Sequence, residues 1–328
     1  MTKGILSSAL AGLCALSGLV AVTGAKAQDT FPSKPIILVA TGTVGGGADV
    51  QARLVADAID RAGLISEPVA VLNRGTAGSQ EAYQFVQQRA GDAHYLLTVT
   101  NQFLTYPMVG DAGYDWLEFT PIANLVYDPV VAVVQASSEI DDLNELVAAA
   151  QEAGGAMTVG GGQIGTQDHM GYLTFAEAAG MEARYVAFAG GAETHRNILG
   201  GQVDVVFGNP SDFLQSVEAG NLKVIGILDE ERNPAPLLAE VPTAIEQGID
   251  ATFVVWRGWV AAPDITEEER DTLISYFETV AEDSAFQEQY VTRFGLRPTF
   301  VAGDELRAFI EEQEGIYTDL LTQAGVIQ

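Results

Sequence analysis

Two glycine-rich turns carry the residues best suited to chemistry in this sequence. The first covers residues 41–49 and the second residues 160–169, and each lies between an apolar segment and a helical pattern. Glycine lets the backbone turn sharply and lets a ligand approach the amide N–H groups. The helix behind each turn adds unpaired N–H groups and the positive end of its dipole, a combination that binds anions. The two turns therefore predict two amide cradles that clamp an anion between two lobes.

Either turn taken alone is explained equally well as a plain tight turn. Two turns at matched places favour a ligand, because open α/β sheets bind ligands at this edge. The second turn also fits G-x-G-x-x-G through Gly160, Gly162 and Gly165, with Glu182 further on, but one match is weak evidence for a dinucleotide site. The first turn is no P-loop, since no Lys-Ser or Lys-Thr pair follows Gly47. No cofactor and no metal are expected.

Arg257 is the best candidate for a positive charge in such a site. It follows an apolar segment and stands between Trp256 and Gly258, where no helix face explains it. A guanidinium can hold a carboxylate through two parallel hydrogen bonds, and an adjacent indole can form a wall of the site. The alternative is a structural ion pair with one of the many acidic residues. The sequence leaves both interpretations open.

Polar side chains and glycines at the ends of other predicted strands could complete the site. Each of them alone is more often a turn or cap residue than a ligand contact. The candidate ligand-binding residues are Thr43, Gly45, Gly46, Gly47, Ala48, Asp49, Ser79, Thr100, Asn101, Gly165, Thr166, Gln167, His169, Phe188, Gly190, Gly191, Asn209, Trp256 and Arg257.

Catalytic machinery is hard to find in this sequence. The three histidines are His94, His169 and His195, and none stands in a metalloprotease motif. The pattern G-x-S-x-G of serine hydrolases is also missing. Asp168 and His169 could polarise a serine, but no serine is marked by its context. We therefore predict that the chain is not an enzyme, with an exported hydrolase as a less favoured alternative.

The charge balance is strongly acidic and excludes one class of partner. The chain has 44 Asp and Glu against 16 Lys and Arg, for a formal net charge of -28 at pH 7. Nucleic-acid binding needs a basic face, so no nucleic-acid partner is expected. At physiological salt the long-range field is screened within about 8 Å, so contact groups decide whether an anion binds. Helix N-termini and a rare cation must then supply the local positive charge.

The first 27 residues have the three parts of a secretory signal. Lys3 supplies the positive start, residues 5–22 carry no charge, and residues 25–27 (AKA) form a cleavage site. We expect cleavage after Ala27 and a periplasmic protein. A membrane-anchoring helix is the alternative. Lipidation at Cys14, the only cysteine, is disfavoured because Leu13 stands where a small residue is needed.

Apolar runs and helical patterns alternate along the rest of the chain. Strands are expected at residues 35–40, 69–72 and 95–99, separated by helices at 48–61 and 79–89. Such strand–helix units predict a parallel sheet covered on both faces. A second set predicts another lobe, with strands at 130–134, 157–159, 185–188, 203–207 and 222–228 and helices at 141–150, 166–179 and 211–219. No flexible linker is present, so strands that cross between the lobes should join them.

The C-terminal part and the helix starts complete the expected elements. A strand is expected at residues 252–255, and helices at 266–281 and from Asp304 onward. Thr266 and Glu269 predict a capping box. The expected N-caps of three other helices are Ser79, Asp141 and Ser284.

Seven short motifs together resemble one known family. They are residues 31–36 (FPSKPI), 45–49 (GGGAD), 73–78 (NRGTAG), 165–169 (GTQDH), 200–204 (GGQVD), 241–243 (VPT, with Gly248) and 256–258 (WRG). In this order they resemble the extracytoplasmic binding proteins of tripartite tricarboxylate transporters, the TctC or Bug family. The resemblance covers nearly all of the chain after residue 27.

The resemblance implies an α/β, type II periplasmic-binding fold of two Rossmann-like lobes with a hinge and a central cleft. Lobe 1 would comprise residues 28–128 and 253–328, and lobe 2 residues 129–252. Backbone amides and waters of the 45–49 and 165–169 segments would hold a ligand carboxylate. Ser79, Gly190, Gly191, Trp256 and Arg257 match further site positions of the family.

The implied partners are a small organic carboxylate and one large and one small membrane subunit, with the protein itself a monomer. We therefore expect a periplasmic receptor that captures a tricarboxylate or dicarboxylate for transport. A receptor for an aromatic acid or an amino acid that acts in sensing is the alternative. Two loops depart from the family pattern, at residues 41–44 (TGTV) and 187–188 (AF), so the choice of ligand stays open.

Overall fold

The structure, a computed structural model, describes residues 31–75 and 79–328. The predicted signal peptide, its cleavage site and Cys14 lie outside these residues. Within them, no helix has both the length and the apolar character needed to cross a membrane. Two separate β-sheets organise the chain from residue 32 onward, one of six strands and one of five.

The six-stranded sheet has the order β11-β4-β10-β3-β1-β2. Its strands are β1 (Ile36–Ala40), β2 (Val69–Asn73), β3 (Tyr95–Val99), β4 (Thr120–Pro129), β10 (Val254–Ala261) and β11 (Arg297–Ala302). β1 pairs with β2 and β3 in parallel, as predicted, but β10 and β11 pair only antiparallel. The sheet is therefore mixed and not all-parallel, because a C-terminal strand is inserted between β3 and β4.

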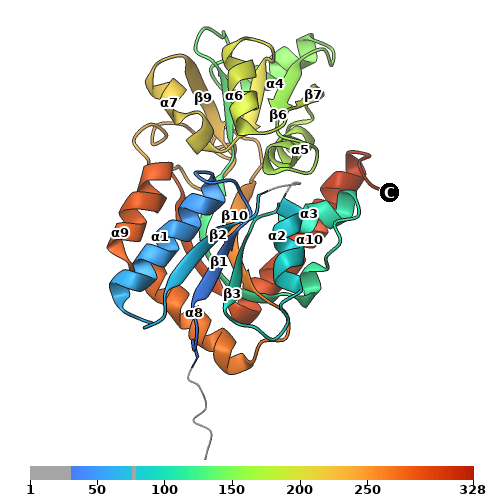
Figure 1. Cartoon of the computed structure of the whole chain (residues 1–328). Helices are drawn as coiled ribbons and strands as arrows, with labels where there is room; N and C mark the ends of the chain where they lie inside the picture. Colours follow the sequence, from blue (N-terminus) through green and yellow to red (C-terminus); the bar gives the residue numbers. More distant parts are fainter. Residues whose placement is uncertain (1–30, 76–78) are drawn as a thin grey trace, which may run out of the picture. The chain divides into compact units, whose positions relative to one another are not determined.

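Helices cover both faces of this sheet (Figure 1). The helix α1 (Gly47–Ala62) lies on the same side as α8 (Glu267–Glu282) and α9 (Ser284–Phe286), with α2 (Gln80–Gln87), α3 (Gln102–Val109) and α10 (Gly303–Gln323) opposite. Short helical turns lie at Trp116–Glu118 and Gln287–Thr292. Covered faces explain why these strands consist of nearly continuous apolar residues.

The five-stranded sheet has the order β7-β6-β8-β5-β9. It consists of β5 (Val131–Gln135), β6 (Thr158–Gly161), β7 (Arg184–Ala187), β8 (Val205–Gly208) and β9 (Leu222–Ile227). Its helices are α4 (Leu143–Glu152), α5 (Gln167–Ala179), α6 (Gly191–Leu199) and α7 (Leu214–Glu218), with a 3-10 turn at Pro210–Asp212. Every strand in this sheet lies within two residues of its expected place, because each is a short apolar run between turn residues.

Two chain segments connect the sheets side by side. β4 continues into β5 through Val130 alone, and the amide of Leu228 after β9 donates to the carbonyl of Val130 at 2.8 Å. The amide of Phe253 then donates to the carbonyl of Leu228 at 2.9 Å, just before β10 begins. Both connections are therefore extended and hydrogen-bonded to each other.

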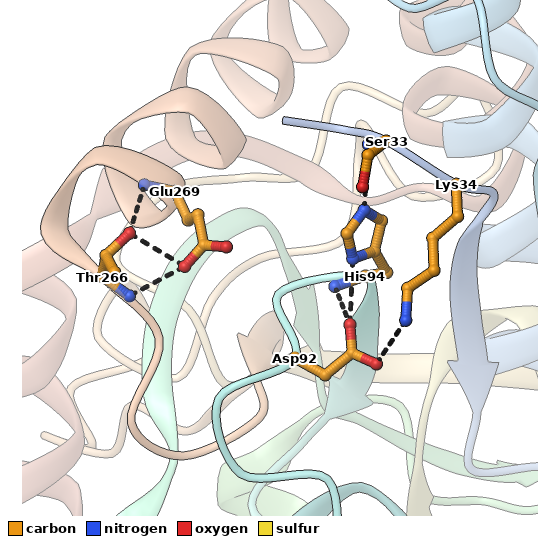
Figure 2. A network of polar contacts seen from close by, with 6 residues as sticks. All are labelled: Ser33, Lys34, Asp92, His94, Thr266 and Glu269. Carbon is orange, nitrogen blue, oxygen red and sulfur yellow. Dashed lines mark hydrogen bonds and ion pairs between the residues drawn. The ribbon is translucent and has the colours of Figure 1, made fainter. Parts of the chain in front are cut away.

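The predicted capping box of α8 is confirmed. The Thr266 hydroxyl accepts from the Glu269 amide at 3.2 Å, and the Glu269 carboxylate accepts from the Thr266 amide at 2.9 Å (Figure 2). Two other cap assignments are wrong by one residue. Asp142 caps α4 and Asp283 caps α9. In each case the aspartate side chain accepts a hydrogen bond from the backbone amide three residues later.

A polar cluster ties the start of the described chain to the loop before β3. The Ser33 amide donates to Nε2 of His94 at 3.2 Å, so the proton of this ring sits on Nδ1 and faces Asp92 at 2.9 Å (Figure 2). Lys34 pairs with the other oxygen of Asp92 at 2.7 Å. His94 therefore has a structural role as a link between two segments.

Candidate functional site

The two glycine-rich turns have the same backbone conformation. Gly45 and Gly165 have φ of 82° and 83°, and the N-cap residues after them, Gly46 and Thr166, agree within 1° in both φ and ψ. In each turn the N-cap amide donates at 3.0 Å to the carbonyl three residues earlier. A left-handed residue is required before each helix, which accounts for glycine at both places. The two turns are therefore equivalent in backbone conformation and hydrogen bonding.

A side chain from the first helical turn closes each turn in the same way. The Gly45 amide donates to Asp49 at 2.8 Å, and the Gly165 amide donates to Nδ1 of His169 at 3.3 Å. Because Nδ1 accepts this bond, the His169 ring is neutral, and burial lowers its pKa to about 4. Asp49 and His169 therefore shape the turns and leave the N–H groups at the starts of α1 and α5 for another acceptor.

Two adjoining cavities of about 230 Å³ each lie against these helix starts. They share Gly47, Ser211, Asp212 and Arg257. The first is also lined by Gly45, Gly46, Val50, Asp128, Tyr290, Phe294 and Leu296. The second is also lined by Thr41, Gly42, Ala48, Ser79, Thr100, Gln102, Gln167, Asn209 and Val255. Residues that belong to both sheets and their helices therefore meet around one space.

Nine of the predicted site residues line these cavities. They are Gly45, Gly46, Gly47, Ala48, Ser79, Thr100, Gln167, Asn209 and Arg257. Most importantly, Gly47 and Gln167 both line the second cavity, and they are the first residues of α1 and α5. The structure therefore brings the two predicted helix N-termini to one cavity.

The remaining predicted residues lie around the cavities without lining them. Thr43, Asp49, Thr166 and His169 hold the turns, and Phe188 packs against Gly160. The Gly165 carbonyl accepts from the Thr105 hydroxyl of α3 at 2.7 Å. Gly190 and Gly191 start α6 beside Asp212, and the fully buried amide of Asn101 has no partner among the described residues.

Trp256 lies in the core, away from the cavities. Its side chain has no exposed surface, and its Nε1 donates to the hydroxyl of Tyr317 of α10 at 3.2 Å. Successive side chains of a strand point to opposite faces, so Trp256 and Arg257 cannot both face the cavity. The interpretation of Trp256 as a wall of the site is therefore wrong.

Arg257 faces the cavities and is also engaged in an ion pair. It lies in the middle of β10, next to a register shift between Arg257 and Gly258 that bends the strand. Its Nε donates to Asp128 of β4 at 3.0 Å. A Cβ added to Gly47 would lie 2.8 Å from the guanidinium, which therefore rests on the start of α1. Arg257 thus lines the cavities and forms a structural ion pair at the same time, so the two interpretations do not exclude each other.

Two aspartates that line the cavities, Asp128 and Asp212, were not among the predicted site residues, whereas Asp168 was considered as part of the 165–169 segment and beside His169. Burial raises the pKa of Asp128, and Arg257 counteracts only part of this effect. Burial, and to a lesser degree Asp212 and Asp128, raise the pKa of Asp168 to about 7. Asp128 could have been noticed as the one charged residue in a ten-residue, otherwise uncharged strand. Asp212 gave no such signal.

Ser79 stands at the predicted N-cap position of α2, but its side chain makes no capping hydrogen bond. Its φ is 73°, a conformation that is costly for a residue other than glycine. Its hydroxyl donates to the carbonyl of Thr41 instead. Ser79 therefore ties the start of α2 to the first glycine-rich turn.

Gly75 supports the same turn by close backbone contact. A Cβ on Gly75 would lie 2.6 Å from both the Gly42 oxygen and the Thr43 nitrogen. We predict that Gly75→Ala lowers the free energy of unfolding by about 1–3 kcal/mol, since backbone must move to make room. Gly110→Ala is the control, because nothing lies within 4 Å of its added Cβ. Urea denaturation of both variants measures this, and equal stabilities would contradict the predicted clash.

A larger cavity of about 610 Å³ lies elsewhere. Asp229 and Arg297 form an ion pair of 3.2 Å at its wall, and Glu177, Glu230 and Asp319 also line it. Its lining includes no helix N-terminus and no glycine, so it offers an anion little besides one paired arginine. The described residues also contain no group of three potential metal ligands.

Sequence comparison finds related proteins over most of the chain. The sequence model described as the tripartite tricarboxylate transporter family receptor, TctC, matches residues 51–326. A UPF0065 protein of Bordetella pertussis is 27% identical over 97% of this chain and 98% of its own length. The protein BugT of the same organism is 25% identical over 95% of this chain and 94% of its own length.

Solved structures share the fold at low sequence identity. BugD, a periplasmic binding protein, has a TM-score of 0.76 at 24% identity, covering 90% of this chain and 99% of its own. MatC from Rhodopseudomonas palustris with bound malate has a TM-score of 0.74 at 22% identity, covering 89% and 100%. A second protein of R. palustris, solved with adipate, has a TM-score of 0.78 at 21% identity, covering 90% and 99%. The predicted two-lobed α/β fold is therefore confirmed.

Proposed function

The chain belongs to the tripartite tricarboxylate transporter receptor family, TctC, and on that premise we propose that it captures a small organic carboxylate for transport. The ligand would bind between two lobes in the periplasm and pass to the large and small membrane subunits of the transporter. MatC and the second R. palustris protein were solved with malate and adipate, both dicarboxylates, which supports a carboxylate as the ligand. The protein would act as a monomer without catalysis.

One observation carries this proposal: the first residues of α1 and α5 line the same cavity. Each helix start offers backbone N–H groups and a partial positive charge to an anion. The Arg257 guanidinium lies against Gly47 and adds hydrogen-bond donors at the same place, although Asp128 offsets much of its charge. An anion of carboxylate size would therefore be held mainly by backbone groups, which explains how a very acidic protein could bind it.

The two sheets support the proposed division into lobes. The first sheet takes strands up to Pro129 and again from Val254, and the second takes all strands between Val131 and Ile227. We propose lobe 1 as residues 28–128 and 253–328 and lobe 2 as residues 129–252. Closure would then bend the paired connections at Val130 and Leu228, and a ligand that contacts both lobes would favour the closed form.

A ligand panel tests the proposed function. The expected result is that one carboxylate raises the thermal stability, by about 2.7 kcal/mol at a hundredfold excess over its Kd. The panel holds mono-, di- and tricarboxylates, aromatic acids and amino acids, with the methyl ester of each acid as its matched control. Recovery of the compound unchanged separates a receptor from an enzyme. If no member of the panel stabilises the protein, the proposed function is wrong.

A further inference from the structure

The cavities contain more negative charge than a receptor for simple dicarboxylates or tricarboxylates would need. Arg257 is paired with Asp128, which leaves that pair close to neutral. Asp212 is exposed and lines both cavities; its amide donates to the Asn209 carbonyl at 3.1 Å, but its carboxylate has neither an ion pair nor a hydrogen bond among the described residues. Its carboxylate lies over the start of α6, since a Cβ on Gly191 would come within 2.9 Å of its Cγ. A second or third ligand carboxylate would therefore meet a like charge here.

Two buried polar atoms in the first cavity also lack partners. Oδ1 of Asp128, a residue with no exposed surface, accepts no hydrogen bond within the described part of the chain. The hydroxyl of Tyr290, which is 3% exposed, makes no hydrogen bond of good geometry there, although it lies near the Arg257 guanidinium. Both residues line the cavity that Asp212 lines. Buried polar groups nearly always have partners, so these two atoms are available to a hydrogen-bond donor or acceptor of a bound ligand.

The chemistry of the unsatisfied groups defines what that partner must be. Two carboxylates and a hydroxyl can all accept hydrogen bonds, and an ammonium group offers three donors and a positive charge. The start of α1 at Gly47 lines both cavities, whereas the start of α5 at Gln167 lines only the second of them, which is therefore the better place for a carboxylate. The site therefore has an anion end and a cation end that adjoin at Arg257 and Asp212.

We propose that Asp212 selects the ligand by charge, so that the site takes a small carboxylate that also carries a protonated amine. The carboxylate binds to the starts of α1 and α5 near Arg257. The amine lies between Asp212 and the free oxygen of Asp128, and the Tyr290 hydroxyl accepts a further hydrogen bond. This inference rests on the proposed function and narrows its ligand class to amino carboxylates.

The proposal has a definite pH dependence. Partial desolvation and the neighbouring Asp128 raise the pKa of Asp212 to about 6, while Arg257 opposes this shift. The other charged group that interacts with Asp212 is Asp168 on α5, whereas Glu193 on α6 is turned to the Ala189 amide. Asp212 is ionised above this pKa, so an amino carboxylate should bind more tightly there and more weakly as the pH falls below it. A plain dicarboxylate should show the opposite trend.

Matched ligand pairs test the charge selection by calorimetry. Aspartate and succinate differ by one amine, as do glutamate and glutarate, and γ-aminobutyrate and butyrate. We expect the amino member of one pair to bind the wild-type protein about tenfold or more tightly than its partner, the scale of one hydrogen bond to a charged group. Asp212→Asn should abolish this preference by weakening the amino member and strengthening the other.

Glu218→Gln is the control variant, because it removes the same charge from an exposed position on α7 of the same lobe. It should keep the wild-type preference. If the dicarboxylate binds the wild type more tightly than its amino counterpart, or if Asp212→Asn leaves the ratio unchanged, the charge selection is refuted while the proposed function stands. If no member of any pair binds, the charge selection is refuted, and the wider ligand panel decides on the proposed function.

Discussion

Replacing Arg257 by methionine is expected to lower the free energy of unfolding by about 3–5 kcal/mol at about pH 8. The substitution leaves a buried carboxylate without its positively charged partner. Asp128 has no exposed surface, and Arg257 is the cation that pairs with it. Methionine keeps much of the volume of the side chain while removing its charge and its donors. Urea denaturation of the free protein measures the loss without any ligand.

Two features of this prediction separate charge from packing. The double variant Asp128→Asn with Arg257→Met should recover most of the loss, because a neutral pair carries no charge that must be desolvated. The deficit of the single variant should also shrink as the pH falls, since Asp128 can then become protonated. Burial already raises the pKa of Asp128, so its protonation at lower pH removes the penalty of an unpaired charge. A double variant no more stable than the single variant would contradict the ion-pair explanation.

The pairing of Arg257 with Asp128 shows where sequence reasoning reached its limit. Arg257 stood out because a cation after an apolar segment needs a special explanation. Its partner lies 129 residues earlier on β4, a strand that the sequence analysis did not identify at all. Antiparallel pairing between β4 and β10 is a long-range contact that no local pattern encodes. The existence of a partner could be inferred, but its identity depended on the order of the strands.

The glycine-rich turns were accessible to sequence reasoning for the opposite reason. Their conformation depends on Gly45 and Gly165 and on the residues directly around them, so a local pattern suffices. The error on Trp256 was avoidable, because strand alternation already places Trp256 and Arg257 on opposite faces. Asp212 was beyond reach, since its position over α6 depends on how the turn after β8 packs. Local backbone design could thus be predicted, whereas the electrostatics of the cleft could not.

Asp168 offers the second large effect, because its charge destabilises the protein that contains it. The side chain is 5% exposed, its Oδ2 accepts from the Gly162 amide at 2.7 Å, and its Oδ1 has no partner among the described residues. Its pKa is raised from 3.8 to about 7, mainly by burial. A raised acid pKa means that the folded state binds more protons than the unfolded state between these two values. Stability from this group is therefore greatest at low pH and is lost as the pH rises towards 7.

Asp168→Asn is expected to remove this penalty. Asparagine keeps an oxygen for the Gly162 amide but carries no charge at any pH. The difference in free energy of unfolding between the variant and the wild type should rise by about 4 kcal/mol from pH 4 to pH 8, because one pKa unit corresponds to about 1.4 kcal/mol. Asp142→Asn is the matched control, since Asp142 also accepts a backbone amide, from Glu145 at 2.8 Å, but at an exposed helix start. If the free energy of unfolding of Asp168→Asn, relative to the wild type, changes with pH as it does for this control, the charged form of Asp168 does not destabilise the fold. A larger gain would mean that the second glycine-rich turn is held by a carboxylate that the fold stabilises poorly.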